Sequence, residues 1–570
     1  MIERVIINQN KYFREINIKN YIEKNSLKIK EKYLEIIRAL SNIEINNKKL
    51  KEHYIYLDKH SLWEMSLIRE KNPFKSKGLY KSIKFLACKE ILNEFKGKKI
   101  KFFLKDQELK DSIQSLNNKD VSVYFDRKNK KRSHFYLYSL LKIIKFFILF
   151  LFYKKKKINL DNEILIFSYF AHYKISKDKF TFLNWSGIEN IFNKQKISWL
   201  NIFIPSKLFK NRNDLHKKKY LGNNKLNFIY DFLTFRIIFN VVYNYLKFVL
   251  KYYFIKKNIS NNLDNTIKQI INIQEFELKD SLCGFDLFQN LIWIHLFEKV
   301  FSVIPKKKIG FYLFENQSWE KAFVVAWKKY NHGILIGCIP TTINYWHLNY
   351  YYSKKELSLE NKVFSPNLIF SNSNYNCKEL KNFNLYSPNV KKVESLRFNY
   401  LNKVKFNTSP INNNKILFLG DYSDFLNKEF LSFFFNFQKS NKNFKLFVKP
   451  HPVSNFFLNK KISNKFNYKI TYLDTIKLAS RFNIIISSNS TSAGLEFLIL
   501  KKFLLVFDSY DSLDLSPFKN YKVPYIKDIN QLNILKNYKL GFKKFSKFYF
   551  TSNKLNLWKK EINKIYKQSN

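Results

Sequence analysis

The sequence is poor in glycine, proline and cysteine. It contains 11 glycines, 11 prolines and four cysteines in 570 residues. Neither GxGxxG nor GxxxxGKS/T occurs, which argues against dinucleotide binding of the Rossmann type and against a P-loop. HExxH and GxSxG are also absent, so the signatures of zinc peptidases and of α/β-hydrolases are missing.

The cysteines and the N-terminus indicate a reducing compartment. Cys88, Cys283, Cys338 and Cys377 are scattered and form no CxxC pair, so we expect neither a zinc site nor a disulfide framework. The N-terminal residues are charged and lack the apolar core of a secretory signal. We therefore expect a cytoplasmic protein.

Acidic residues are also scarce. Lys and Arg number 101 against 45 Asp and Glu, a formal charge of +56, which is typical of proteins that bind nucleic acid or anionic membranes. However, Lys greatly outnumbers Arg, and Asn, Ile, Phe and Tyr are abundant, as AT-rich codons would supply. The Lys residues are spread over every segment, so we expect no nucleic-acid partner. A non-enzymatic nucleic-acid-binding protein stays as an alternative, which predicts strongly salt-sensitive binding.

The length allows three or four domains at about 150 residues each. Residues 1–134 combine a helical pattern over 79–95 with an apolar strand over 99–104, which indicates a small α/β region. Residues 135–158 form a basic, apolar helix or linker, and two further domains follow at 159–405 and 406–570.

The most hydrophobic stretch, residues 135–153, is nearly long enough to span a bilayer. Lys142 and Lys145 lie near its middle, where charge is costly, and Lys154–Lys157 follow it. These features favour a helix lying in the plane of an anionic membrane surface over a membrane span. A helix buried in the protein is the other interpretation. Residues 235–257 have the same aromatic and basic character.

Beyond residue 160, short apolar strands alternate with helical segments, which predicts a doubly wound α/β fold. The expected strands cover 164–169, 197–205, 308–314, 333–338 and 368–371, and a second set covers 415–419, 445–448, 483–486 and 503–507. Polar clusters follow the ends of several strands. In open α/β sheets the carboxyl ends of the strands are where ligands bind.

Three of these clusters carry candidate chemistry. Lys449-Pro450-His451-Pro452 holds a histidine in a backbone restricted by two prolines. The run from Ser487 to Glu496 combines hydroxyl groups with a helix start, a pattern that can bind an anion or merely cap a helix. Glu315, in the sequence ENQSWE, is either a general base at a strand end or a capping carboxylate on the following helix.

The order and spacing of these elements resemble the HP and SS motifs of two-domain glycosyltransferases. That group includes bacterial sialyltransferases, 3-deoxy-manno-octulosonic acid transferases and, more distantly, CDP-glycerol glycerophosphotransferases. The whole chain is more closely similar to surface carbohydrate biosynthesis proteins of the Leptospira O-antigen type. The likeness is carried over about residues 55–520 by HSLWE at 60–64, the 164–169 strand, Asn184-Trp185, ENQSWE at 315–320, KPHP at 449–452, SSNSTSAGLEF at 487–497 and Leu515-Ser516-Pro517.

This resemblance implies a GT-B-like architecture, two Rossmann-like domains facing a cleft, beside the N-terminal α/β region. It implies glycosyl transfer, with inversion, from a CMP- or CDP-linked donor (an ulosonic acid is one candidate sugar) to a lipid-linked glycan in O-antigen or capsule synthesis, at the inner face of the cytoplasmic membrane. The alternative is a CDP-glycerol-type polyol-phosphate transferase. No DxD pair follows a predicted strand, so we expect neither metal nor cofactor.

The resemblance also assigns residues to roles. Glu315 would be the base, and His451 would contact the donor phosphate. The remaining donor-side candidates are Lys449, Pro452, Ser487, Ser488, Ser490, Thr491, Ser492, Glu496 and Asp421. The acceptor-side candidates are Asn316, Gln317, Glu320, Thr341 and Thr342. A Gln-His element is expected after the 333–338 strand, and Thr341 and Thr342 stand there instead.

Overall fold

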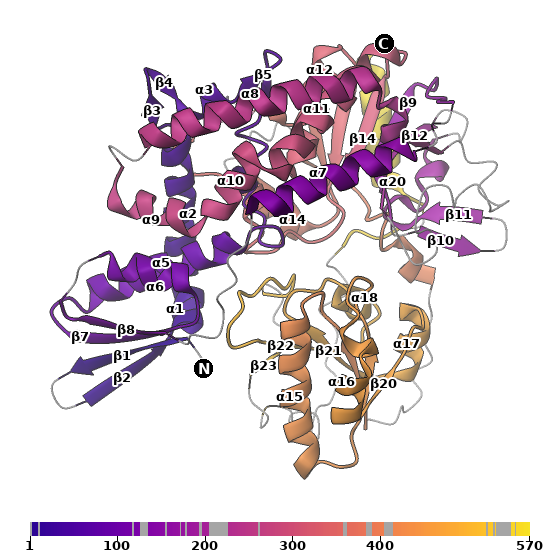
Figure 1. Ribbon diagram of the computed structural model, residues 1–570. Helices are drawn as coiled ribbons and strands as arrows, with labels where there is room; N and C mark the ends of the chain where they lie inside the picture. The colour runs from indigo at the N-terminus through magenta and orange to yellow at the C-terminus, as the bar shows by residue number, and fades with distance from the viewer. Residues whose placement is uncertain are drawn as a thin grey trace.

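The computed structural model describes residues 3–569 except 10–11, 117–118, 126–134, 154, 156, 172, 177–178, 193–196, 205–225, 260–262, 357–361, 383–389, 404–413, 520–522, 528–530, 532–548 and 553. Two parallel α/β sheets lie one above the other in Figure 1, and an N-terminal α/β unit lies beside them. The expected fold class, two Rossmann-like domains plus an N-terminal α/β region, is confirmed by these sheets.

The first large sheet has seven parallel strands in the order β13-β12-β9-β14-β15-β16-β17. Its central strands are buried on both faces, which is why they appear in the sequence as unbroken apolar runs. The strands are β9 (Ile164–Phe170), β12 (Ile197–Phe203), β13 (Leu226–Phe228), β14 (Ile309–Leu313), β15 (Ile334–Cys338), β16 (Leu368–Ser371) and β17 (Val390–Lys392). Its helices include α12 (Ser318–Lys329) and α14 (Asn374–Asn382), and β10 (Tyr173–Ser176) with β11 (Lys179–Phe182) forms a side hairpin.

The second large sheet has six parallel strands in the order β20-β19-β18-β21-β22-β23. The strands are β18 (Lys415–Leu419), β19 (Lys445–Lys449), β20 (Tyr468–Ile470), β21 (Ile484–Ser488), β22 (Phe503–Phe507) and β23 (Tyr525–Ile526). Its helices are α15 (Asp424–Ser440), α16 (Lys460–Lys465), α17 (Thr475–Arg481) and α18 (Gly494–Ile499). Every strand expected from the sequence in the two domains is present, with ends within two residues of the expected ones.

The N-terminal unit is built on a four-stranded sheet in the order β2-β1-β7-β8. Its strands are β1 (Arg4–Gln9), β2 (Tyr12–Asn17), β7 (Lys99–Leu104) and β8 (Val121–Phe125). Its helices are α1 (Ile18–Lys24), α2 (Ser26–Ser41), α3 (Leu50–His53), α4 (Leu67–Glu70), α5 (Lys77–Glu94) and α6 (Gln107–Gln114), with two-stranded ribbons at β3 (Glu44–Ile45)/β4 (Lys48–Lys49) and β5 (Ile55–Tyr56)/β6 (His60–Ser61). The expected 99–104 strand and 79–95 helix are both found. Buried apolar residues of this unit share one core with those around the seven-stranded sheet.

A layer of helices connects the unit to the seven-stranded sheet. It consists of α7 (Phe135–Leu151), α8 (Phe235–Ile259), α9 (Asn265–Ile273), α10 (Glu275–Cys283) and α11 (Phe285–Val303). One face of α7 packs on α11, where the rings of Phe146 and Phe147 contact Phe288. In the part of the chain that the structure describes, no helix has the length and apolarity needed to cross a membrane.

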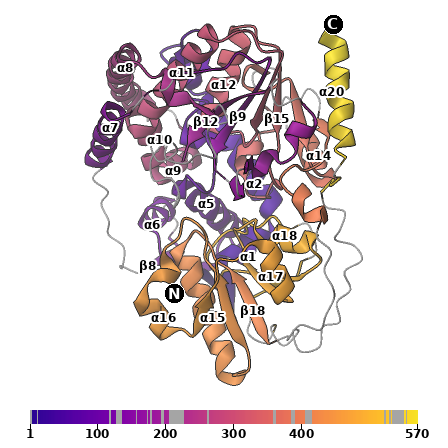
Figure 2. The same cartoon turned by 90° about the vertical axis from the view of Figure 1, so that its right-hand side faces the viewer.

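The last helix, α20 (Asn556–Ser569), leaves the second domain and packs on the first sheet. Trp558 lies 5.9 Å from the Phe311 ring and donates its indole N–H to the Glu394 carbonyl at 2.7 Å. Figure 2 shows α20 along the upper lobe, away from α15 and β18. The sequence predicts a single domain over residues 406–570. In the structure, Leu555 and the Trp558, Ile562 and Ile565 side chains of α20 belong to the core of the seven-stranded sheet.

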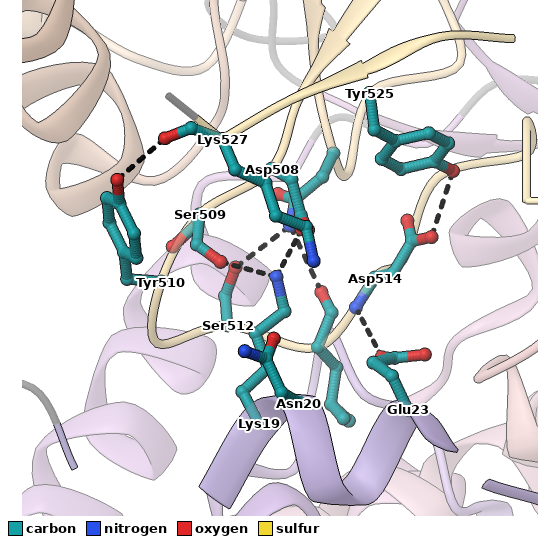
Figure 3. A network of polar contacts seen from close by, with 12 residues as sticks. Lys19, Asn20, Glu23, Asp508, Ser509, Tyr510, Ser512, Asp514, Tyr525 and Lys527 are labelled. Carbon is teal, nitrogen blue, oxygen red and sulfur yellow. Dashed lines mark hydrogen bonds and ion pairs between the residues drawn. The ribbon is translucent and has the colours of Figure 1, made fainter. Parts of the chain in front are cut away.

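The N-terminal unit also contacts the second domain. In Figure 3, Lys19 on α1 forms an ion pair with Asp508, which directly follows β22. Glu23, one turn further, accepts the Asp514 backbone N–H at 3.4 Å and the Trp346 indole N–H, from the first domain, at 3.2 Å. One short helix therefore contacts both large domains through charged side chains.

Candidate functional site

Both large sheets have a point at which the strand order reverses. The first sheet runs outward from β9 through β12 and then returns to β14, and the second runs outward from β18 and returns to β21. A crevice forms outside the carboxyl ends of the strands at such a point, and it is the usual ligand site of doubly wound sheets. Glu315 follows β14, Asp421 follows β18, and Ser488 ends β21. The ENQSWE cluster and the serine run therefore lie at the two reversal points, and the KPHP element at 449–452 follows β19, the strand beside β18.

Glu320 binds the backbone of Glu315 and Asn316 through its carboxylate. Its carboxylate accepts the backbone N–H groups of Glu315 at 3.1 Å and of Asn316 at 2.9 Å, and Asn316 adopts a positive φ of 53°. The capping role that the sequence left open for Glu315 therefore belongs to Glu320, which is buried against this backbone. Burial and the neighbouring Glu315 raise the pKa of Glu320 well above its usual range.

Glu315 remains available at the strand end. It is partly buried, and burial raises the pKa of its carboxyl, while the Gln317 side-chain N–H, Lys75 and Arg397 oppose that shift. A carboxylate with a raised pKa is a better general base near neutral pH than an ordinary glutamate.

Lys75, from the N-terminal unit, reaches this same position. Its ammonium group donates to Gln317 Oε1 at 3.2 Å and pairs with Glu70 at 2.8 Å. Gln317 Oε1 also accepts the hydroxyl of Tyr169, at the end of β9, at 3.1 Å. Glu70 in turn accepts the Ser318 N–H at the start of α12 at 3.2 Å. A cation from a distant segment thus lies beside the candidate base, and nothing in the local sequence around Lys75 signals it.

The other acceptor-side candidates divide into exposed and internal groups. Asn316 is buried and donates to the Asn349 carbonyl at 2.6 Å, and Thr342 is buried against the Tyr549 hydroxyl. Both side chains therefore make internal hydrogen bonds, and their role in acceptor contact stays a prediction. Gln317 and Thr341 are partly exposed at the sheet edge.

On the other sheet, Asp421 is the centre of the polar edge. It is fully buried and accepts the hydroxyls of both Ser488 and Ser490, as well as the Ser423 N–H at 2.8 Å. Ser487 is also buried and donates to the Ser488 carbonyl at 3.1 Å. The hydroxyl protons of these serines are therefore directed into the protein, whereas the sequence predicts them at the donor phosphate.

The segment after these serines differs from the expected cap. The residue before α18 is Ala493, which makes no side-chain capping bond, and the Thr491 Oγ1 accepts the Ala493 N–H at 3.4 Å. Thr491 and Ser492 are partly exposed at the edge. Glu496 accepts the Thr475 hydroxyl, and Lys449 lies 3.5 Å from that same hydroxyl oxygen. Lys449 and Glu496 thus belong to one polar cluster with Thr475.

His451 follows β19 and is partly buried, while Pro452 beside it is exposed. Burial lowers the pKa of His451, and Asp421 opposes the shift, so the ring is neutral near pH 7. Its Nδ1 accepts the Val453 N–H at 3.3 Å, which assigns the ring proton to Nε2. His451 therefore offers one N–H donor from a neutral ring.

Aromatic rings connect the two edges. Phe74, the residue before Lys75, packs edge-on against His347 at 4.9 Å and against Tyr422 at 5.5 Å. Tyr422 lies 6.3 Å from the His451 ring. The segment Phe74-Lys75 thus contacts residues that flank Glu315 on one side and His451 on the other.

His347 is a further candidate that the sequence did not single out. Burial lowers the pKa of His347 to about 4, so it is neutral, and among the described residues its Nε2 has no hydrogen-bond partner. The resemblance predicts a Gln-His element after β15, and His347 lies in the segment that follows this strand, eight residues beyond Ile339.

The described residues contain no group of three or more His, Cys, Asp or Glu side chains that could hold a metal ion. What the site contains is a carboxylate of raised pKa, an ammonium group, a neutral histidine N–H donor and exposed hydroxyls. These groups can deprotonate a hydroxyl and can donate to an anion.

Neither the scan against family models nor the search of curated proteins finds a match. Among solved structures, UDP-GlcNAc 2-epimerase of Methanocaldococcus jannaschii in complex with UDP-GlcNAc and UDP matches with a TM-score of 0.42 and 12% identity, covering 71% of this chain and 99% of that chain. The UDP-GlcNAc-bound epimerase of Neisseria meningitidis matches at 0.40 and 13%, covering 71% and 99%. A glycosyltransferase of Rickettsia africae matches at 0.36 and 11%, covering 72% and 98%. These TM-scores lie below 0.5, so the fold assignment rests on the order and direction of the strands.

Proposed function

We propose that the protein is a GT-B-type glycosyltransferase that uses a nucleotide-activated sugar. The observation that carries this proposal is the placement of Glu315 at the reversal point of the first sheet and of His451 at the end of β19, the strand beside the reversal point of the second sheet. The segment Phe74-Lys75 is in contact with the neighbours of both residues. Such a site supplies a base for the acceptor and a donor for the departing phosphate, which are the two requirements of sugar transfer.

In the proposed reaction, Glu315 takes the proton of an acceptor hydroxyl. The acceptor oxygen forms a bond to the anomeric carbon, and the bond from that carbon to the nucleotide phosphate oxygen breaks. The His451 Nε2–H donates to the phosphate as its negative charge develops, and preorganised donors of this kind stabilise such charge. Single displacement gives inversion at the anomeric carbon. Lys75 lies where it can balance the carboxylate charge before proton transfer.

The motif resemblance extends the proposal to a particular class of donor and acceptor. Its KPHP and SSNSTS elements favour a cytidine nucleotide sugar, with an ulosonic acid as one candidate, and a lipid-linked glycan of O-antigen or capsule synthesis at the inner face of the cytoplasmic membrane. The same motifs serve CDP-glycerol-type transferases, so the product bond decides between a glycoside and a phosphodiester. The proposal uses His and hydroxyl donors and requires no metal.

The test is nucleotide release by the full-length protein. CMP-ulosonic acids, UDP-GlcNAc and CDP-glycerol would each be incubated with extracted lipid-linked glycans, and the products analysed by mass spectrometry. We expect release of one nucleotide that depends on acceptor, with a new glycosidic bond. Isomerised sugar nucleotide without transfer, or a phosphodiester product, would contradict the proposal. Consumption of no donor would contradict it as well.

A further inference from the structure

Helices α7 and α8 each carry two apolar stripes. One stripe of α8 packs inward through residues such as Val241, Phe248 and Tyr252. The opposite stripe is exposed and is formed by Phe235, Phe239, Tyr243, Leu246, Leu250, Tyr253 and Phe254. In an ordinary surface helix that second stripe is polar. On α7 the exposed residues are Tyr136, Leu137, Tyr138, Leu140, Leu141, Ile144, Ile148, Leu149 and Leu151.

The two exposed stripes belong to one side of the molecule. The Tyr136 and Tyr253 hydroxyls lie 2.7 Å apart at one end, and the rings of Phe150 and Phe235 lie 5.2 Å apart at the other. The helices therefore run antiparallel, and Figure 2 shows them together along one edge of the upper lobe. Of the 35 exposed large apolar side chains among the described residues, 16 come from these two helices. An exposed apolar concentration of this kind marks an interaction surface.

The charge of this surface has one sign. Neither helix contains an Asp or Glu, and together they carry Lys142, Lys145, Arg236, Lys247, Lys251, Lys256 and Lys257. In the sequence, Lys154–Lys157 follow α7. Glu275 of α10, at one end, pairs with Lys256 at 3.6 Å. The partner must therefore combine an apolar interior with negative charge at its rim.

We propose that the exposed faces of α7 and α8 dock the protein on an anionic lipid bilayer, with both helices in the plane of the interface. Apolar side chains enter the boundary between head groups and acyl chains, and the Lys and Arg side chains contact the anionic head groups. A second copy of this chain is not the partner, because two such surfaces would place cations against cations. A span is not the geometry, because neither helix has the character needed to cross a membrane.

Docking has a consequence for the site that rests on the proposed function. The helices that carry the surface pack on α11, and α11 packs on α12, which begins three residues after Glu315. The surface and the acceptor side of the site therefore belong to one body. Membrane docking would hold this body, and not the nucleotide-binding domain, next to a lipid-linked acceptor.

The experiment is sedimentation of the full-length protein with two kinds of vesicle. One contains phosphatidylcholine alone, and the other contains phosphatidylcholine with about 30% of the anionic lipid phosphatidylglycerol. We expect binding to the anionic vesicles that weakens as salt rises. Two variants test the surface: Leu141→Gln/Leu149→Gln/Phe239→Gln/Leu250→Gln removes exposed apolar groups, and Lys145→Glu/Arg236→Glu/Lys247→Glu reverses exposed charge. Each is expected to lower the bound fraction at least about tenfold.

Matched controls alter the same residue types elsewhere. Tyr12→Gln/Phe13→Gln changes exposed rings on β2, and Lys428→Glu/Lys439→Glu/Lys442→Glu changes exposed lysines on and just after α15. Both controls are expected to bind vesicles as the unaltered protein does, and circular dichroism would check that every variant is folded. The proposal is overturned if the unaltered protein does not sediment with anionic vesicles, or if the surface variants and the control variants bind these vesicles equally. A dimer in light scattering that is lost in the surface variants, without vesicle binding, would also overturn it.

Vesicle binding needs no nucleotide and no turnover. Absence of vesicle binding would therefore contradict docking without contradicting the proposed function. Absence of nucleotide release would contradict the proposed function without contradicting docking.

Discussion

At the scale of single residues, the structure defines the tautomer and the protonation state of the His451 ring. Its proton lies on Nε2 because Nδ1 accepts a backbone N–H, and burial lowers the pKa of the ring. Replacing His451 with Ala removes one preorganised donor, so we expect the turnover number to fall about 10²–10³-fold, as for other donors to a developing anion. Nucleotide release would measure it.

The matched control for that change is His53→Ala. His53 contacts the Ile45 carbonyl within the N-terminal unit, away from both sheet edges. It is expected to keep full turnover. Equal loss in both variants would show that the effect is on folding and not on the site.

The second residue-scale prediction concerns Glu315. Replacing it with Gln keeps its size and removes the base, so we expect turnover to fall about 10²–10⁴-fold. In the unaltered protein, burial raises the pKa of Glu315. The base therefore becomes protonated at a higher pH than an ordinary glutamate, and activity should decline at that higher pH as the pH is lowered. A pH profile of kcat/KM measures this limb. An unchanged profile in Glu315→Gln, or an equal loss in Glu561→Gln on α20, would contradict the assignment.

The sequence predicted that polar clusters follow particular strand ends, but not the contacts that each side chain makes there. KPHP follows β19 and the serine run ends β21, so the two lie at the same edge of one parallel sheet, on either side of β18. The sequence did not show that Asp421 accepts hydrogen bonds from the hydroxyls of Ser488 and Ser490. That contact joins residues nearly 70 positions apart, and no local pattern encodes it.

At the scale of elements, α20 shows how a short terminal helix can belong to a distant core. Trp558 is 2% exposed against the first sheet, and its N–H groups bond to Glu394. We expect Trp558→Ala to lower the free energy of unfolding by about 3–5 kcal/mol, the usual cost of removing a large buried ring. Denaturant unfolding would measure it, and Lys559→Ala, exposed on the same helix, should change it little. A Trp558→Ala protein as stable as this control would contradict the packing.

The segment Phe74-Lys75 is the second element that the sequence left unmarked. It follows an ordinary Asn-Pro turn, and its importance comes only from contacts with Gln317, His347 and Tyr422. By contrast, the helix that follows it was predictable from its apolar spacing alone. Periodicity identifies elements, whereas the partners of an exposed ring or ammonium group depend on tertiary structure.

At the scale of the whole molecule, the N-terminal unit couples the two domains through buried charge. Burial and the nearby Glu23 raise the pKa of Asp514 to about 6, against its bonds from Ser516 and Tyr525. A carboxyl whose pKa is higher in the folded state stabilises the fold at low pH and loses that contribution as pH rises through about 6.

Asp514→Asn removes this titration. We expect the free energy of unfolding of the unaltered protein, relative to Asp514→Asn, to fall by roughly 1–2 kcal/mol between about pH 5 and about pH 8. Urea unfolding of both proteins across that range measures it. A difference that stays constant with pH would show that the Glu23–Asp514 contact is not coupled to stability.

If the protein works as proposed, the edge of the six-stranded sheet binds a nucleotide. The direct measurement is hydrogen–deuterium exchange of the full-length protein with and without CMP, CDP, UDP and GDP. We expect one nucleotide, a cytidine nucleotide by the motif resemblance, to slow exchange in peptides covering residues 449–453 and 487–493. Protection confined to other segments, or none with any nucleotide, would contradict it.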